Sequence, residues 1–208
     1  MEFVLKEKFI ELLQPKSLAT VIALVLLGAV LLAVSRKTRF NAKLISYGAL
    51  CIAASFLLSY VKIFQLPNGG TITVGSMLPL FLFAFIAGPW AGIGAGLCYG
   101  MLQFIQEPVF LHPAQLLLDY PLAFAMLGIA GFFKNKQFFG ILVGGLGRFI
   151  CHVLVGVIFF AEYANGQNVY LYSMMYNASY LIPDIIICLV LFAVPQIKSI
   201  TRRVTSIG

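Results

Sequence analysis

Charged side chains are scarce in this chain of 208 residues: 10% are charged and 61% are hydrophobic. Soluble domains carry about 25% charged residues, so the shortage argues against a water-exposed globular fold. Apolar runs of about 20 residues, each long enough to cross a bilayer as a helix, fill the sequence instead. Alternating segments of about ten residues are missing, which argues against a transmembrane barrel and against strands in general.

We predict seven membrane-spanning helices with short polar connections. The third and fourth are short and meet at Gly88-Pro89, which is the least distinct boundary of the set. The four cysteines lie far apart within the spans and show no metal-ligand spacing, so neither a metal site nor a disulfide is expected. The predicted spans cover residues 17–35, 44–63, 72–88, 90–105, 114–133, 139–163 and 174–196.

Acidic residues are absent from three segments in which basic residues cluster. With seven spans, all three segments lie on one side of the membrane, and the positive-inside rule makes that side cytoplasmic. The N-terminus is then expected outside and the C-terminus inside, and the net charge of +7 reflects topology rather than nucleic-acid binding. The basic residues are Arg36, Lys37, Arg39 and Lys43; Lys134 and Lys136; and Lys198, Arg202 and Arg203.

We predict one helical membrane domain with an additional segment at each end. We expect residues 1–43 to form an amphipathic surface segment followed by an extra transmembrane helix. Residues 44–198 are expected to form the main membrane domain, and residues 199–208 a cytoplasmic tail. Glycines recur every four residues over 92–100 and cluster again over 140–147. Small residues at such spacing predict close helix packing in lipid.

Motifs for ATP hydrolysis, zinc-dependent hydrolysis and nucleophilic catalysis are missing from the sequence. We therefore expect no enzymatic activity, no cofactor and no metal. A chain of this kind cannot drive pumping alone and depends on another source of energy.

Three of the predicted spans carry polar or ionisable side chains, which are costly in lipid and are therefore functional candidates. Gln115 and Asp119 lie one turn apart on the fifth span, and Arg148 and His152 lie four residues apart on the sixth. Because lipid would reject these polar faces, we expect them to converge inside the protein. The last span contributes Ser173, Asn177 and Asp184, with Tyr172, Tyr176 and Tyr180 nearby.

These residues also have structural interpretations. Arg148 and Asp184 could neutralise each other as a buried pair, and His152 and Asn177 could simply join helices by hydrogen bonds. Asp119 could pair with Arg148 or be protonated. No basic residue is obvious at its depth, however, so a cationic ligand is the favoured partner. Aromatic rings add about 0.5–2 kcal/mol each to the binding of a desolvated cation.

Four long blocks carry a resemblance: GGTITVGSMLPL (69–80), HPAQLLLDYPLAFAMLGIAG (112–131), GRFICHVLVGVIFFAEYA (147–164) and YSMMYNASYLIPD (172–184). With these blocks the chain resembles the thiamin-specific S components of energy-coupling factor (ECF) vitamin transporters, from about residue 44 to 197. The resemblance implies an all-α six-helix core in a prokaryotic cell membrane, preceded here by one extra N-terminal transmembrane helix. It also implies capture of extracellular thiamin and docking with an ECF transmembrane coupling subunit and two ABC ATPases.

The same resemblance implies roles for single residues. Asp119 matches the acid that engages the aminopyrimidine of thiamin, and Tyr120 matches the tyrosine beside it. Ala49 and Ala53 match the small-residue motif that docks the coupling subunit. The other implied ligand-binding residues are Arg148, His152, Phe160, Tyr172, Asn177 and Tyr99, of which Phe160 and Tyr99 are aromatic residues of the pocket.

The chain departs from the family pattern at several of these positions. Some members have Glu, Lys and Trp where this chain has Asp119, Arg148 and Phe160. A shorter carboxylate and a smaller ring are expected to change affinity rather than ligand identity. Helical geometry alone would place Phe159, and not Phe160, nearer the face of His152.

Two other functions stay open at this stage. The chain could be an S component for another vitamin, such as riboflavin or biotin. It could also be an autonomous proton-coupled carrier in which Asp119, Asp184 and His152 form a relay. The outer loop LPNGGTIT (66–73) is rich in turn residues and is well placed to cover a cavity that opens outward.

Overall fold

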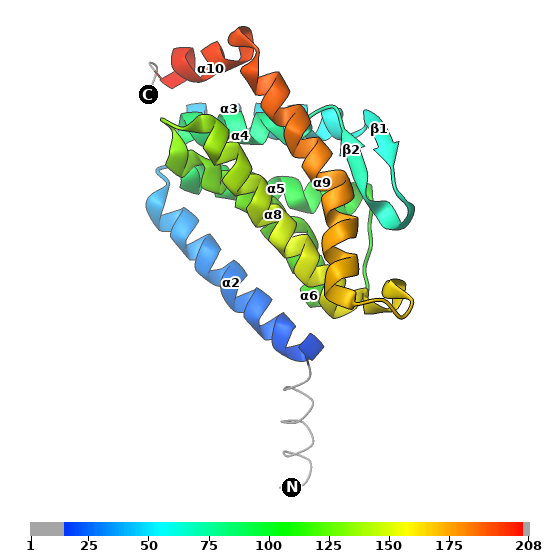
Figure 1. Cartoon of the computed structure of the whole chain (residues 1–208). Helices are drawn as coiled ribbons and strands as arrows, with labels where there is room; N and C mark the ends of the chain where they lie inside the picture. The colour runs from blue at the N-terminus through cyan, green and yellow to red at the C-terminus, as the bar shows by residue number, and fades with distance from the viewer. Residues whose placement is uncertain (1–14, 206–208) are drawn as a thin grey trace, which may run out of the picture.

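The computed structural model describes residues 15–205, which are mainly helical (Figure 1). The first half contains α2 (Pro15–Lys37), α3 (Ala42–Ser59), the strands β1 (Lys62–Gln65) and β2 (Thr71–Thr73), α4 (Leu78–Ala87) and α5 (Pro89–Gln106). One continuous helix then comprises α6 (Pro113–Leu117), the π-helical turn η2 (Leu118–Leu122), α7 (Ala123–Ala125) and the 3-10 segment η3 (Met126–Phe133). The chain continues through α8 (Gln137–Phe159), a short 3-10 turn η4 (Ala161–Ala164), α9 (Val169–Ala193) and α10 (Pro195–Thr205).

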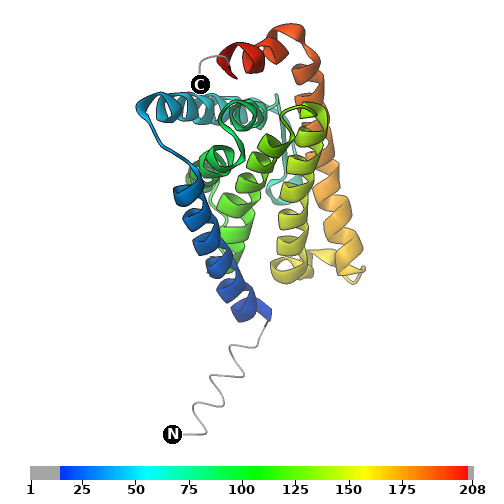
Figure 2. The same ribbon diagram turned by 90° about the vertical axis from the view of Figure 1, so that its left-hand side faces the viewer.

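The helices pack around α5 and the continuous helix that follows it. That helix lies against α4, α5 and α8, while α9 packs on α8 from the other side. In Figures 1 and 2, α3, α4 and α5 run across the direction of α8 and α9. Helix α2 lies along the outside of this bundle, against α5 and α6 (Figure 2).

The all-α membrane fold predicted from composition is confirmed, although the individual spans differ. Within the described residues, five helices are long and apolar enough to cross a bilayer: Ser17–Lys37, Ala42–Ser59, Pro113–Phe133, Gln137–Phe159 and Val169–Ala193. Helix α4 has only 10 residues, so the predicted span 72–88 is wrong as a single helix. Helix α5 is rich in glycine and glutamine and is not among the five.

The expectation that strands are absent is wrong for the segment after α3. The predicted span 44–63 ends as a helix at Ser59, and β1 and β2 then pair antiparallel, with Phe64 opposite Ile72. The turn between them contains Asn68 with φ of 68° and Gly69 with φ of 95°. Asn-Gly is a strong hairpin signal because both residues tolerate positive φ. The predicted outer loop is therefore an ordered β-hairpin.

Two expectations concern the chain ends. The amphipathic segment predicted at the N-terminus falls mostly on residues 1–14, outside the described residues. The predicted tail boundary at residue 198 lies within α10, which packs on α4 and α9. Lys198 Nζ lies 5.4 Å from the ring centre of Phe138, and Gln137 donates a hydrogen bond of 3.2 Å to Thr201. This segment is thus a docked helix and not a free tail.

Glycines let α5 and the continuous helix meet backbone against backbone. A Cβ added at Gly128 would lie 2.1 Å from the backbone N of Ile93, and one at Gly96 would lie 2.3 Å from the carbonyl O of Phe124. A Cβ at Gly100 would lie 2.5 Å from the carbonyl O of Tyr120. The glycine spacing predicted this close approach, which fixes the position of η2 relative to α5.

We predict that Gly128→Ala destabilises the protein by about 2 kcal/mol, because the added methyl group meets backbone atoms that cannot turn away. The control is Gly28→Ala in α2, where an added Cβ has no neighbour within 4 Å. That change is expected to be neutral or slightly stabilising, since Ala favours helix over Gly. Thermal unfolding in detergent measures both, and equal midpoints for the two variants would contradict the prediction.

Candidate ligand-binding site

A cavity of about 410 Å³ lies between the hairpin, the end of α5, η2, α8 and α9. Its volume falls within the range of small-molecule sites, which is about 300–1,000 Å³. Of the eight residues predicted to bind ligand, all except Tyr99 line it: Asp119, Tyr120, Arg148, His152, Phe160, Tyr172 and Asn177. The polar faces predicted on three spans therefore converge.

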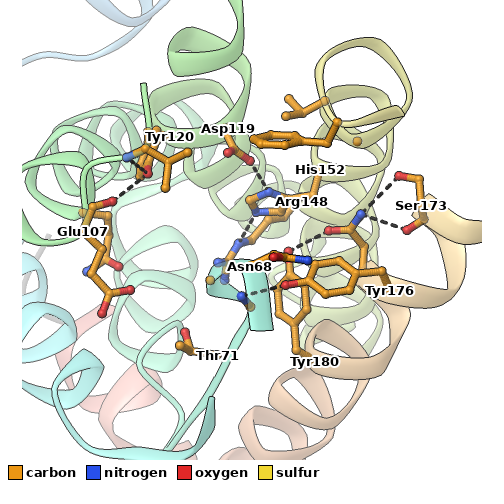
Figure 3. Close-up of a pocket in the computed structure, with 18 of the residues that line it drawn as sticks. Asn68, Thr71, Glu107, Asp119, Tyr120, Arg148, His152, Ser173, Tyr176 and Tyr180 are labelled. Carbon is orange, nitrogen blue, oxygen red and sulfur yellow. Dashed lines mark hydrogen bonds and ion pairs between the residues drawn. The ribbon is translucent and has the colours of Figure 1, made fainter. Parts of the chain in front are cut away.

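Asp119 is presented by the π-helical turn η2. Pro121 lies inside this turn, lacks a backbone N–H and would clash with the carbonyl group of Leu117 in a regular α-helix. The wider π turn accommodates the proline, and such turns are frequent at functional sites. The carboxylate of Asp119 accepts a hydrogen bond of 3.1 Å from Gln115 and lies 2.5 Å from Nδ1 of His152 (Figure 3).

His152 connects Asp119 to Arg148. Nε of Arg148 donates to Nε2 of His152 at 3.2 Å, while Nδ1 of the same ring faces the carboxylate of Asp119. The guanidinium of Arg148 also lies 4.2 Å from the ring centre of Phe124.

Asp184 ends this chain of contacts. Its Oδ2 lies 4.0 Å from Nη1 of Arg148, and its Oδ1 accepts hydrogen bonds from the backbone N–H of Thr73 at 3.1 Å and from the Thr73 hydroxyl at 2.9 Å. Strand β2 is thus tied to α9. We call Asp119, His152, Arg148 and Asp184 the charge chain.

The charge chain corrects one premise of the sequence analysis. Basic side chains do lie at the depth of Asp119, because His152 contacts it and Arg148 follows. Counted at their formal charges, with histidine taken as neutral, two carboxylates and one guanidinium nevertheless leave one surplus negative charge. Beside the cavity, Lys62 of β1 forms an ion pair with Glu107, which adds no net charge. A cation is therefore still the favoured guest.

Aromatic side chains from α9 and the end of α8 form one wall of the cavity. The rings of Tyr172 and Tyr176 are nearly parallel, with centres 6.2 Å apart, and Tyr180 meets Tyr176 edge-on at 5.8 Å. Tyr180 donates a hydrogen bond of 2.7 Å to the side-chain oxygen of Asn177. The hydroxyl of Tyr180 and the amide of Asn177 are therefore engaged with each other, and Figure 3 shows the side chains of Tyr176 and Tyr180 next to each other at this wall.

Phe160 enters the cavity because α8 ends just before it. Phe159 is the last residue of α8, and Phe160 has φ of −118° and ψ of 23°, outside helical values. Phe159 does not line the cavity, and its ring stacks on His112 at 5.4 Å. The helical projection that favoured Phe159 was wrong at this point, since it assumed a continuing helix.

Tyr99 is the predicted ligand-binding residue that does not line the cavity. It is fully buried, its hydroxyl donates to the carbonyl O of Ser55 at 3.3 Å, and its ring packs edge-on against Phe124 at 4.8 Å. Phe124 itself lines the cavity. Tyr99 therefore supports the wall from behind and is not part of its surface.

The predicted ligand-binding set did not include several other residues that line the cavity, among them Glu107, Phe124 and Asn68. Tyr176 and Tyr180, which were expected near the polar face of the last span but were not assigned to the ligand, also line it and follow Tyr172 at steps of four. Glu107 is one of only seven acidic residues and directly follows a predicted span. Nothing in the sequence distinguishes Phe124 from the other phenylalanines.

The hairpin closes one side of the cavity. The hydroxyl of Tyr176 accepts a hydrogen bond of 3.0 Å from the N–H of Gly70 and donates one of 2.5 Å to the carbonyl O of Pro67. The hydroxyl of Tyr120 is also engaged, since it donates to the carbonyl O of Glu107 at 2.7 Å and accepts from the N–H of Val109 at 3.0 Å. Tyrosine hydroxyls thus hold the loops, while the rings face the cavity.

The two alanines predicted to dock a partner lie away from the cavity. Ala49 and Ala53 are both exposed on α3, one turn apart. Ile45 and Leu57 continue the same face at four-residue steps and are 58% and 68% exposed. This face is apolar and consists of small residues between two large ones.

Comparisons with known proteins agree with this architecture. Over 160 residues the chain is 37% identical to the thiamine transporter ThiT of Bacillus subtilis, covering 67% of this chain and 83% of that protein. Over 122 residues it is 30% identical to ThiT of Lacticaseibacillus paracasei, covering 49% of this chain and 61% of that protein. The solved structure of ThiT from Listeria monocytogenes has the same fold, with a TM-score of 0.70 and 23% identity over 79% of this chain and 99% of that one.

A family comparison covers most of the chain. The sequence model of the family described as "Thiamine transporter protein" matches residues 45–203, which include the hairpin, every residue that lines the cavity, and both Ala49 and Ala53. The chain therefore belongs to the thiamine transporter protein family.

Proposed function

We propose that this chain is the substrate-capture subunit, or S component, of an ATP-driven ECF importer and that it binds thiamin in the cavity. The observation that carries this proposal is the surplus negative charge beside an aromatic wall. Thiamin has one permanent positive charge on its thiazolium ring and a second, planar pyrimidine ring. Family membership supports the same ligand.

The cavity offers a distinct environment to each part of thiamin. The Asp119–His152 pair combines a carboxylate acceptor with an imidazole that is held in place by Arg148, which suits an aminopyrimidine. Ring faces of Tyr172, Tyr176 and Phe160 suit the thiazolium, since each desolvated cation–ring contact contributes about 0.5–2 kcal/mol. Seven of the eight residues inferred from the family resemblance line the cavity, and we assign them to ligand binding.

The distribution of charge supports capture from the outside. The cavity lies where α8 ends and α9 begins, whereas the basic segments lie at the opposite ends of these helices, before α8 and in α10. If the basic end faces the cytoplasm, as the positive-inside rule indicates, the cavity faces outward. The N-terminus is then outside and the C-terminus inside.

Two other functions are less consistent with the site. A proton relay through Asp119, His152 and Asp184 has a continuous path in the charge chain, but Arg148 interrupts it because a guanidinium does not release its proton. A biotin site would need to accommodate an anion, and riboflavin is neutral, so the surplus negative charge favours thiamin over both.

Energy for import must come from partners. We propose that the exposed Ala49–Ala53 face of α3 docks an ECF transmembrane coupling subunit, which recruits two ABC ATPases. Small side chains allow helices from different subunits to approach closely in lipid. The position of this face, away from the cavity, allows the chain to hold its ligand while docked.

We predict that Asp119→Asn weakens thiamin binding by about 2–4 kcal/mol, because a buried charged hydrogen bond is lost and the surplus charge disappears. Calorimetric titration of the detergent-purified protein against a vitamin panel measures the effect. The control is Glu162→Gln, which removes an exposed acid and should leave affinity unchanged. Tight thiamin binding by Asp119→Asn would show that Asp119 is not part of the site. If the wild type binds another vitamin more tightly than thiamin, that vitamin is the ligand.

We further predict that Ala49→Phe or Ala53→Phe abolishes thiamin uptake in cells while leaving binding to the purified protein intact. A bulky ring on this face keeps a partner helix at a distance. The matched control is Ala29→Phe on the exposed side of α2, which should preserve uptake. Normal uptake by both α3 variants would place the docking surface elsewhere.

A further inference from the structure

Helix α2 lies outside the region that the family shares, since the family match begins at residue 45. It nevertheless packs against α6, the first part of the helix that carries Asp119. Small residues at the contact allow this approach: Ala19 and Ala23 of α2 and Ala114 of α6 are buried in one cluster. The rest of α2 is largely exposed on the lipid side.

One polar contact joins α2 to the start of α6. The hydroxyl of Thr20 lies 3.4 Å from Nδ1 of His112, and the same nitrogen accepts a hydrogen bond of 3.3 Å from the backbone N–H of Ala114. His112 is therefore the N-cap of α6, a position where a side-chain acceptor stabilises the first turn. The His112 ring also stacks on Phe159, the neighbour of Phe160.

The first turn of α6 leads directly to the ligand-binding carboxylate. Gln115 is fully buried, accepts a hydrogen bond of 3.2 Å from the backbone N–H of Leu111, and donates one of 3.1 Å to Asp119. One amide side chain thus fixes both the loop before α6 and the orientation of the acid. Any shift of the capped turn moves Gln115 and therefore Asp119.

We infer that α2 braces the ligand-binding site: Thr20 holds His112, and His112 acts as a positioning residue for Asp119 through the first turn of α6. The contact with Phe159 extends the brace to the end of α8, where Phe160 follows in the chain. This inference rests on the proposed binding of thiamin. It assigns to α2 a part in affinity as well as membrane anchoring.

The test compares thiamin titrations of the full-length protein and two variants of Thr20. Thr20→Val keeps the shape but loses the hydroxyl, so thiamin affinity should fall about threefold, the low end of the effect of one hydrogen bond, because the contact is long and shares Nδ1 of His112 with the N–H of Ala114. Thr20→Ser keeps the hydroxyl and should bind within about twofold of the wild type. The control Ser35→Ala removes an α2 hydroxyl that bonds only within its own helix, to the carbonyl O of Leu32, and should have no effect.

A double-mutant cycle separates positioning from general stability. If Thr20 acts through Asp119, Thr20→Val should have little further effect in the Asp119→Asn protein, and the ligand-free Thr20→Val protein should melt only slightly below the wild type and remain folded at the temperature of the titration. Additive losses, or a loss explained by a lower melting temperature, would overturn the brace. A second pair, Ala23→Leu in the buried contact and Ala29→Leu on the exposed face, should show weakened binding only for the first.

These outcomes distinguish the two proposals. Normal thiamin binding by the wild type together with unchanged affinity in Thr20→Val and Ala23→Leu would overturn the brace alone. Absence of thiamin binding by the wild type would overturn the proposed function and the brace with it.

Discussion

The binding site depends on a buried set of charges that does not sum to zero. His152 joins Asp119 to Arg148, Arg148 lies beside Asp184, and the hairpin binds Asp184 through Thr73. A bare surplus charge inside a membrane protein is costly, which is why ionisable groups at such depth normally find partners. The cost is offset when a cation of matching shape enters. Affinity and selectivity then have the same electrostatic origin.

Features of the fold and of the site were predictable where they depend on residues close together in the sequence. Helix positions, glycine contacts and the residues Asp119, Arg148, His152 and Asn177 follow from local patterns and from long blocks shared with a family. The hairpin was missed because its apolar residues continue the run that starts in α3, although Asn68-Gly69 signalled a turn. Tyr99 was misplaced because sequence alone does not separate a ring that faces a cavity from one that supports it from behind.

The contacts of the charge chain could not be predicted from the sequence, for a different reason. The pairing of Asp119 with His152 joins residues 33 positions apart on different helices, and it depends on a π turn that Pro121 imposes on the first of them. Residue types alone do not show which charged side chains share one set of contacts, because those contacts join different helices.

The two hydrogen bonds between Tyr176 and the hairpin tip have a thermodynamic consequence. The same side chain is a wall of the cavity on one side and an anchor for Pro67 and Gly70 on the other. Linkage is reciprocal. A ligand that fixes this ring lowers the free energy of the ordered turn, and an ordered turn makes the binding free energy of the ligand more favourable by the same amount. Binding affinity and hairpin order are therefore linked through a single equilibrium.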